Sequence, residues 1–300
     1  SKDYSGKCQA RVRMDYGKVN DRRVDGNSKE VEQDEGNDEG DNLEAQSSVT
    51  MMVMQESLKS SVWAYQVDRK GAAEDWIAPQ VVHDLETVGL QSEYVVIKSD
   101  QEPSVTEVLR DVARQRQADY GTGIEESMVG ESNTNAYIER AIQDVQAQCR
   151  TMRSALEAKL QSRLDLTSPA IPWLIRHAAC LITRCRVRPC GKTSLEMMKG
   201  RQCNPKIAEF GEVVWFRIPN TRDSPGKFEE QWDSGVYLGF DVRSLESLIG
   251  SDTGVFRVAD LKRRPINERW SSSASDNMTG TPKAALPGQP YRRPPAHSRG

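Results

Sequence analysis

The sequence predicts an α/β protein: a mixed sheet with flanking helices, followed by a small all-β module. A continuous β-branched run at 94–97 is typical of a strand buried in the centre of a sheet. Apolar residues at steps of three and four, from Ile138 to Leu160, are typical of a long amphipathic helix. After Phe210, short strand-like segments separated by Gly, Pro and Asn predict the all-β part.

Strand and helix patterns alternate before the long helix. Residues 10–19 alternate in polarity, with Val12 and Met14 on one face and Arg11, Arg13 and Asp15 on the other, as in a strand. Two more strands, joined by a short polar connection, and two helices around the β-branched run are expected from their periodicity. In order, the expected elements are strands at 10–19, 48–55 and 61–67, a helix at 72–88, a strand at 94–97 and a helix at 104–115.

The second half completes the expected organisation. The long helix begins at about Asn133, and Pro169 and Pro172 precede another helix at 173–186. Strand-like segments follow at 212–218, 235–240 and 254–259. The expected domains are an N-terminal extension at 1–9, a core at 10–200, a small β module at 205–268 and a disordered tail at 271–300, rich in Ser, Pro, Gly and Arg.

The net charge of −3 over 300 residues is unevenly distributed. Between Asp25 and Glu44 there are nine acids and one base, so this segment carries 1 − 9 = −8 and the rest carries −3 + 8 = +5. An insert at 26–46 is therefore expected to be disordered, either as a plain loop or as an acidic arm that competes with DNA. A mildly basic remainder permits nucleic-acid binding. The sequence contains no apolar run near 20 residues and no N-terminal signal segment, and its six cysteines form no CxxC pair, so we expect a reduced intracellular protein without a membrane span.

Three acidic residues stand out by position. Asp15 lies in the first strand, Asp100 follows the apolar strand, and Glu139 lies near the start of the long helix. The carboxyl ends of strands are where open α/β sheets place their sites. Converging carboxylates would hold Mg²⁺, and two such ions assist phosphoryl transfer.

The residues around these acids resemble a known family. Residues 95–103, Val-Val-Ile-Lys-Ser-Asp-Gln-Glu-Pro, and 130–140, Gly-Glu-Ser-Asn-Thr-Asn-Ala-Tyr-Ile-Glu-Arg, resemble the catalytic core of retroelement integrases, most closely the copia-type LTR retrotransposon branch. In that family a strand ends in Ser-Asp, and about 35 to 40 residues later a loop leads into a helix with Glu-Arg or Glu-Lys; here 38 residues separate Asp100 from Glu139. The blocks at 191–201 and 210–211, and Trp232 with Gly-Val-Tyr-Leu-Gly at 235–239, are similar to the family's downstream segments, and the resemblance covers residues 10–268.

The resemblance implies a ribonuclease H-like fold and a polynucleotidyl transferase, part of a retrotransposon Pol polyprotein, that joins DNA 3′ ends to target DNA. Its implied cofactor is Mg²⁺ or Mn²⁺ held by Asp15, Asp100 and Glu139. Its implied partners are DNA and further copies of the chain in an active complex, acting in the nucleus or, before integration, in the cytoplasm. The candidate DNA contacts are Asn135, Arg140, Arg150, Arg153, Lys262, Arg263 and Arg264, although a solvated helix face explains Arg140, Arg150, Arg153 and Arg163 equally well.

The sequence departs from the family pattern in three ways. The candidate first acid, Asp15, has arginines on its own face, and Asp21 and Asp25 stay open as alternatives. Ala136 stands where the family usually has Gly, and the paired His and Cys of the family's zinc module are absent. The alternative function is therefore a catalytically inactive, integrase-derived DNA- or protein-binding protein.

Two other groups of residues have structural explanations. The set His177, Cys180, Cys185 and Cys190 lacks the paired spacing of zinc sites, so we expect a buried structural cluster. Five aromatic residues in the β module are expected to form its core rather than a platform for bases: Trp215, Phe216, Trp232, Tyr237 and Phe240.

Overall fold

The computed structural model describes residues 10–20, 48–71, 75–99, 102–116, 121–126, 132–202, 208–218 and 228–283. The expected N-terminal extension, the acidic insert, Asp21, Asp25 and Asp100 all lie outside these ranges.

The first part of the chain forms a five-stranded mixed sheet in the order β3-β2-β1-β4-β5. β1 pairs antiparallel with β2 and parallel with β4, so the expected neighbourhood of the first strand and the β-branched strand is confirmed. β5 was not predicted, because its sequence Thr-Gly-Ile-Glu-Glu has neither alternation nor an apolar run. The strands are β1 (Ala10–Asn20), β2 (Ser48–Glu56), β3 (Val62–Val67), β4 (Val95–Ser99) and β5 (Thr122–Glu126).

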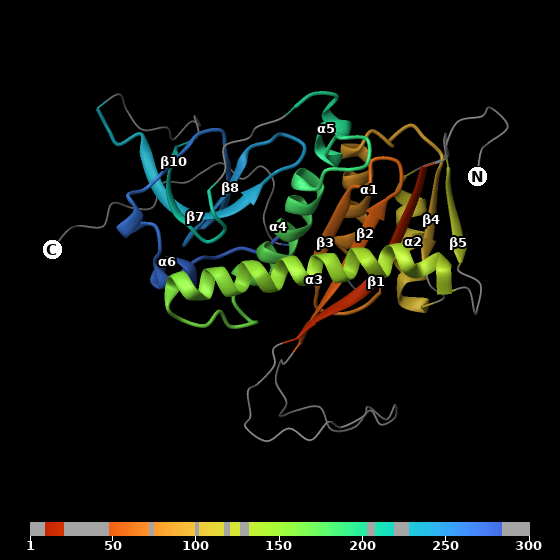
Figure 1. Cartoon of the computed structure of the whole chain (residues 1–300), viewed down its shortest axis with the longest axis horizontal. Helices are drawn as coiled ribbons and strands as arrows, with labels where there is room; N and C mark the ends of the chain where they lie inside the picture. Colours follow the sequence, from red (N-terminus) through yellow and green to blue (C-terminus); the bar gives the residue numbers. More distant parts are fainter. Residues whose placement is uncertain are drawn as a thin grey trace, which may run out of the picture.

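Helices cover both faces of this sheet. Alternate residues of β2 divide between two apolar clusters: Met52 and Met54 join the cluster under α1 (Ile77–Thr87) and α2 (Pro103–Gln115). Met51 and Val53 join the cluster under α3 (Ser132–Leu160) and α4 (Ala170–Cys185). The expected mixed sheet with flanking helices is therefore confirmed, and Figure 1 shows α3 extending from the mixed sheet as far as α6.

The second half forms a five-stranded antiparallel sheet in the order β10-β6-β7-β8-β9, preceded by the short helix α5 (Ser194–Lys199). The predicted all-β module is thus present, with β10 and β9 as the edges of the sheet among the described residues. Closure into a barrel stays a prediction. Its elements are β6 (Val213–Arg217), β7 (Trp232–Phe240), β8 (Ser247–Ser251), β9 (Gly254–Val258), β10 (Leu261–Arg263), a 3₁₀ turn (Ile266–Glu268) and α6 (Ser272–Asp276).

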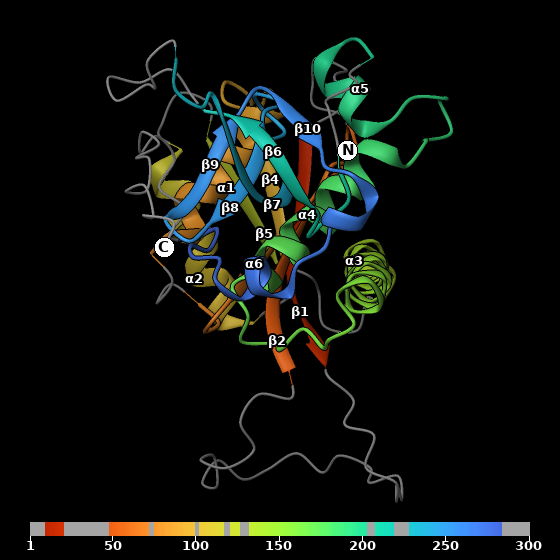
Figure 2. The same ribbon diagram turned by 90° about the vertical axis from the view of Figure 1, so that its left-hand side faces the viewer.

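The two sheets share one apolar cluster. Val236, Leu238 and Leu248 of the antiparallel sheet belong to the same cluster as the buried faces of α3 and α4. One apolar cluster therefore crosses the predicted boundary near residue 205, while another, which includes Phe216 and Tyr237, lies within the antiparallel sheet; Figure 2 shows α4 close to β7.

The expectation of a disordered tail beginning at residue 271 is wrong for residues 271–283. This segment includes α6, its Met278 is buried in the shared cluster, and the indole Nε1 of Trp173 donates a hydrogen bond to the Gly280 carbonyl at 2.9 Å. The Ser-rich composition gave no sign of this structure, because Met278 is its one large apolar residue and most of the other contacts are hydrogen bonds of backbone and hydroxyl groups, such as that from the Thr279 N–H to the Ser251 carbonyl at 2.9 Å. Residues 284–300 lie outside the described ranges.

Candidate active site between β1 and α3

One face of β1 turns toward α3. Val12 and Met14 are buried on the side of α1 and α2, so Arg13, Asp15 and Gly17 point to the opposite side. The side chain of Asp15 is half-buried, and its Oδ1 accepts the backbone N–H of Tyr16 at 2.7 Å. β1 therefore presents one carboxylate to α3, between an arginine and a glycine.

α3 runs alongside β1 in the same direction, as three contacts show. The Arg13 guanidinium lies 4.8 Å from the centre of the Tyr137 ring. A methyl group at Gly17 would lie 2.7 Å from Cγ2 of Ile142, so helix and strand are in close contact there. Farther along, Nε2 of Gln146 donates a hydrogen bond to the Lys18 carbonyl at 2.8 Å.

Glu139 lies in the stretch of α3 that passes Asp15. It falls between Tyr137, which contacts the residue two positions before Asp15, and Ile142, which contacts the residue two positions after it. At 3.6 residues per turn, Ile142 and Gln146 lie about 60° and about 20° from the direction of Glu139. Glu139 is exposed, and it lies at the level of Asp15 on the same side of α3 as Ile142 and Gln146.

Polar residues from four strands lie at one level beside this carboxylate. Glu125, Lys98, Arg13 and Gln55 are successive partners across β5, β4, β1 and β2. Nζ of Lys98 lies 3.7 Å from Oε1 of Glu125, whereas Nε of Arg13 is buried without a hydrogen-bond partner among the described residues. Two cations, Arg13 and Lys98, therefore stand at the level two residues before Asp15.

The donor atoms at this site suit a hard divalent cation. Carboxylate oxygens come from Asp15 on β1 and Glu139 on α3, and Mg²⁺ takes oxygen ligands. Among the described residues, which exclude Asp100, there is no group of three His, Cys, Asp or Glu side chains placed to hold a metal. The assignment of Asp15, Asp100 and Glu139 as metal ligands therefore stays a prediction.

The predicted DNA contacts on α3 separate into two groups. Arg140 lies about 100° around the helix from Glu139, and its Nε is 3.4 Å from Asp144, which also pairs with Arg186 of the α4 terminus. Arg150 and Arg153 lie within about 40° of the direction of Glu139. Asn135 belongs to the first turn of α3, in agreement with the expected start of the long helix at about Asn133.

The cationic residues of the β module also differ from one another. Arg263 pairs with the fully buried Glu212 at 2.7 Å and with Glu209 at 3.1 Å, which gives it a structural role. Lys262 lies 4.4 Å from the centre of the Trp232 ring, and Arg264 lies 5.4 Å from that of Trp215. DNA contacts by these three residues stay predictions.

The expectation of an aromatic core in the β module is right for three residues and wrong for two. Phe216, Tyr237 and Phe240 are fully buried. Trp215 is 37% exposed because it faces away from the core on β6, between the buried Val214 and Phe216, and Trp232 is half-buried at the start of β7.

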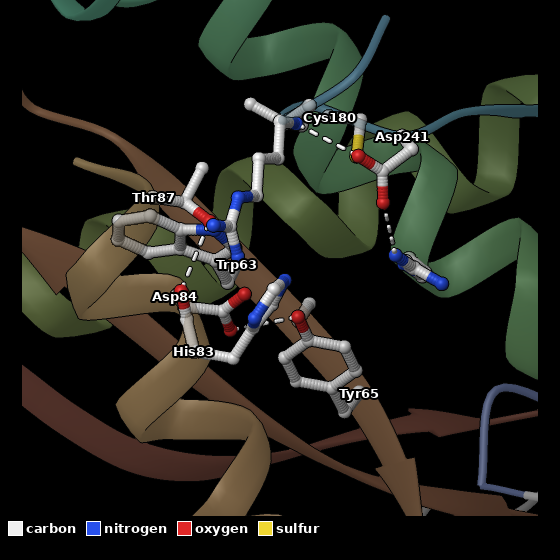
Figure 3. Close-up of a pocket in the computed structure, with 11 residues that line it drawn as sticks. Trp63, Tyr65, His83, Asp84, Thr87, Cys180 and Asp241 are labelled. Carbon is white, nitrogen blue, oxygen red and sulfur yellow. Dashed lines mark hydrogen bonds and ion pairs between the residues drawn. The ribbon is translucent and has the colours of Figure 1, made fainter. Parts of the chain in front are cut away.

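A second charged cluster lies where the two sheets meet, and Figure 3 shows Tyr65 and Asp84 directed at one another. The Tyr65 hydroxyl donates to Oδ2 of Asp84 at 2.7 Å, and Gln80 donates to Oδ1 at 3.0 Å. Burial raises the pKa of Asp84 to about 7, against the hydrogen bond from Tyr65 and the positive charge of Arg176. Arg176 also lies 3.9 Å from Asp241, which follows β7.

The cavity within this cluster has a volume of about 20 Å³, which is room for about one water molecule. Its carboxylates have fixed partners, since Asp241 accepts hydrogen bonds from the backbone N–H groups of Arg243 and Ser244. The cluster is therefore a structural junction rather than a substrate site.

The His and Cys residues of α4 are only partly as expected. His177 and Cys180 are buried, and burial lowers the pKa of His177 to about 3, so it is neutral. Cys185 and Cys190 are exposed, which corrects the expectation that all four form one buried cluster.

Sequence reasoning missed two residues that shape the site. Gly17 permits the close approach of α3, and Gln146 ties the helix to the end of β1. The available signal for Gly17 was a glycine inside an alternating strand, which often marks close approach of a neighbouring element.

Neither a comparison with protein-family models nor one with curated protein sequences gave a match. Among the described helices, none is both long enough and apolar enough to cross a membrane.

Several solved structures are similar. The simian T-cell lymphotropic virus intasome in complex with PP2A regulatory subunit B56 gamma has 14% identity and a TM-score of 0.42, over 85% of this chain and 78% of that chain. The catalytic core domain of BIV integrase has 12% identity and a TM-score of 0.38, over 63% of this chain and 93% of that chain. The HTLV-2 integrase catalytic core domain in complex with magnesium, in its trimeric form, has 12% identity and a TM-score of 0.38, over 63% of this chain and 95% of that chain.

Proposed function

We propose that this chain is an integrase-like polynucleotidyl transferase built on a ribonuclease H-like sheet. The observation that carries the proposal is the course of α3 along β1, which brings Glu139 beside the level of Asp15. Two carboxylates distant in the sequence thus come from neighbouring stretches of β1 and α3, on one face of the sheet. The copia-type resemblance of residues 95–103 and 130–140 points independently to Glu139 and adds Asp100.

Asp100 is the proposed third carboxylate. The parallel pairing of β1 with β4 ends at Arg13 and Lys98, and Asp15 and Asp100 each follow two residues later. If the strands kept that register, the two acids would stand side by side on the face that turns to α3.

Asp15, Asp100 and Glu139 would hold Mg²⁺ or Mn²⁺. When bound, such ions activate the attacking oxygen and stabilise the leaving oxygen of a phosphodiester. The chain's own contribution is to orient the diester: Arg13 and Lys98 offer positive charge beside the carboxylates. We propose DNA as the substrate, several copies of the chain in the active complex, and the nucleus as the place of action, with the cytoplasm before integration.

A strand-transfer assay tests the proposal. The purified chain is incubated with a short duplex bearing element ends, a plasmid target and Mg²⁺, and joined products are counted. We expect the unmutated chain to join DNA ends and EDTA to abolish this activity. Asp100→Asn and Glu139→Gln should each eliminate joining. The control Glu86→Gln, at an exposed acid on α1, should leave it unchanged. Asp15→Asn is expected to behave like the first two.

Two outcomes would change the conclusion. If Asp15→Asn alone keeps activity, Asp21 or Asp25 replaces it as the first acid. If the unmutated chain joins no DNA end with either metal but still binds DNA, the inactive DNA-binding alternative takes the place of the proposed function. The arginine two residues from Asp15 is the feature of the site that favours that alternative, because it can neutralise the carboxylate.

A further inference from the structure

A pocket on the C-terminal half of α3 contains three arginines. It has a volume of about 150 Å³ and is open to solvent. Its lining residues are Arg150, Arg153, Ser154, Glu157 and Arg163. We propose that this pocket binds a phosphate group and that, if the proposed function holds, this is a phosphate of the DNA strand that reaches the active site.

Arg153 and Glu157 build the pocket by holding the chain that follows the helix. Nε of Arg153 donates to Glu157 at 2.9 Å, and its Nη2 donates to the Leu164 carbonyl at 2.7 Å. The backbone N–H of Leu164 in turn donates to Glu157 at 3.0 Å. Gln161, just past the helix, has a φ of 52°, which lets the chain turn back. Arg163 is therefore brought over the same face as the helix arginines.

The pocket keeps positive charge for a ligand. Its lining carries three guanidinium groups and one carboxylate, so the net charge is 3 − 1 = +2. Only Arg153 forms an ion pair with that carboxylate; Arg150 and Arg163 have no carboxylate partner among the described residues. Planar guanidinium groups bind phosphate oxygens in pairs, which favours phosphate over a simple halide.

The pocket lies on the same side of α3 as Glu139. Arg150 is 11 residues after Glu139, and Arg153 is 14 residues after it, which turns them about 20° and about 40° to either side of that glutamate. At 1.5 Å per residue they lie about 16 Å and about 21 Å along the helix. Because phosphates of one DNA strand are about 3.4 Å apart along the duplex axis, a strand following α3 brings its fifth or sixth phosphate from the reacting one to the pocket.

The test uses the full chain with Arg150→Gln/Arg163→Gln as the variant. The matched control, Arg110→Gln/Arg257→Gln, removes the same charge from exposed positions on α2 and β9. Binding of a fluorescent duplex is measured without Mg²⁺ over a range of KCl concentrations. We expect the pocket variant to bind DNA about tenfold more weakly at 100 mM KCl. The slope of log K against log salt should also become shallower by about one. The control should show smaller changes in both affinity and slope.

Methylphosphonate substitutions locate the phosphate. A neutral linkage at the fifth or sixth position should weaken binding by the unmutated chain and the control, but not by the pocket variant, while a neutral linkage at the tenth position should not distinguish them. Equal binding by pocket variant and control, together with no arginine-dependent binding of inorganic phosphate, would overturn the proposal.

The remaining results separate the sources of the phosphate. If inorganic phosphate binds the unmutated chain but not the pocket variant, and DNA binding is equal, the pocket takes a small phosphorylated ligand and the DNA assignment is overturned. If the unmutated chain binds no DNA under any condition, the proposed function fails, and the phosphate titration still decides whether the pocket binds an anion.

Discussion

Two groups of carboxylates in this chain differ in their surroundings. Asp15 lies on the face of the central strand β1 that turns to α3, and Glu139 is exposed on α3; Arg13 and Lys98 are partners on the adjacent strands β1 and β4. Asp84 and Asp241 lie where the two sheets meet; both are buried and satisfied by hydrogen bonds from Tyr65, Gln80 and backbone N–H groups. Carboxylates with accessible oxygens can bind ions and substrates, whereas those with filled hydrogen bonds hold elements together. The perturbed pKa of Asp84 therefore reflects a structural junction rather than a reactive group.

The largest expected difference is in activity. Glu139→Gln should lower metal-dependent strand transfer by roughly 1,000-fold, because a neutral amide is a poor ligand for Mg²⁺. Because Glu139 is exposed, this substitution should change the free energy of unfolding of the protein, measured in urea, by less than about 0.5 kcal/mol. A variant that unfolds markedly earlier would show that Glu139 belongs with the structural carboxylates.

The second difference is in the pH dependence of stability. The folded protein retains a proton on Asp84 up to a pKa of about 7, whereas the unfolded carboxyl loses it near 3.8. The stabilisation is therefore fully present below about pH 4 and is lost as the pH rises to about 7, a change on the order of 4 kcal/mol. Asp84→Asn keeps an acceptor for Tyr65 but does not titrate, so its urea midpoint should fall less than that of the unmutated chain between pH 5 and pH 8. If the urea midpoints of the two proteins changed equally with pH, a group other than Asp84 would be responsible for the pH dependence.

A third experiment probes the packing that brings the two carboxylates of the site together. Gly17→Ala places a methyl group 2.7 Å from Ile142, so we expect a loss of about 1 to 3 kcal/mol of unfolding free energy and reduced strand transfer as α3 shifts. Ile142→Ala removes the obstructing atoms. In a double-mutant cycle, the double variant should lose less unfolding free energy than the two single variants together, by about 1 kcal/mol or more. Additive losses would mean that α3 does not depend on this contact.

The smallest expected effect concerns the acidic insert. Asn20 and Ser48 are paired at the ends of β1 and β2, so the hairpin can close with a shorter connection. Deleting residues 26–46 should change the melting temperature by only a few degrees, in the upward direction, because a shorter loop loses less entropy on closing. A fall of about ten degrees in a thermal melt followed by circular dichroism would show that the insert stabilises the fold.

Sequence patterns predicted the elements whose apolar residues are periodic. The β-branched run before Lys98 and the stripe on α3 identified β4 and α3, and their neighbours in the chain placed Asp15 and Glu139 on the right elements. β5 escaped prediction because an edge strand with an exposed Ile124 carries little pattern. The exposure of Trp215 and the half-buried position of Trp232 were missed because aromatic composition does not say which face of a strand is buried.

Tertiary contacts explain the other surprises. Asp84 occupies an apolar-spaced position of α1, between Val81 and Leu85, which is a signal of burial that composition alone does not reveal. The partners that satisfy it come from β3 and from within α1, and the charge nearest it comes from α4. No local pattern predicts such long-range pairing. For the same reason, the convergence of Arg163 with the arginines of α3 became visible only with the turn at Gln161.

The apolar cluster shared by the two sheets has a consequence for how the molecule comes apart. Because Leu238 and Leu248 pack in the same cluster as Trp173 of α4, neither sheet has a complete dry interior without the other. Melting should then be a single cooperative transition rather than two, and a fragment cut near residue 200 would present the surface around Trp173 to water. An exposed apolar surface of this kind favours self-association. Isolated fragments of this chain are therefore poor substitutes for the intact protein in experiments.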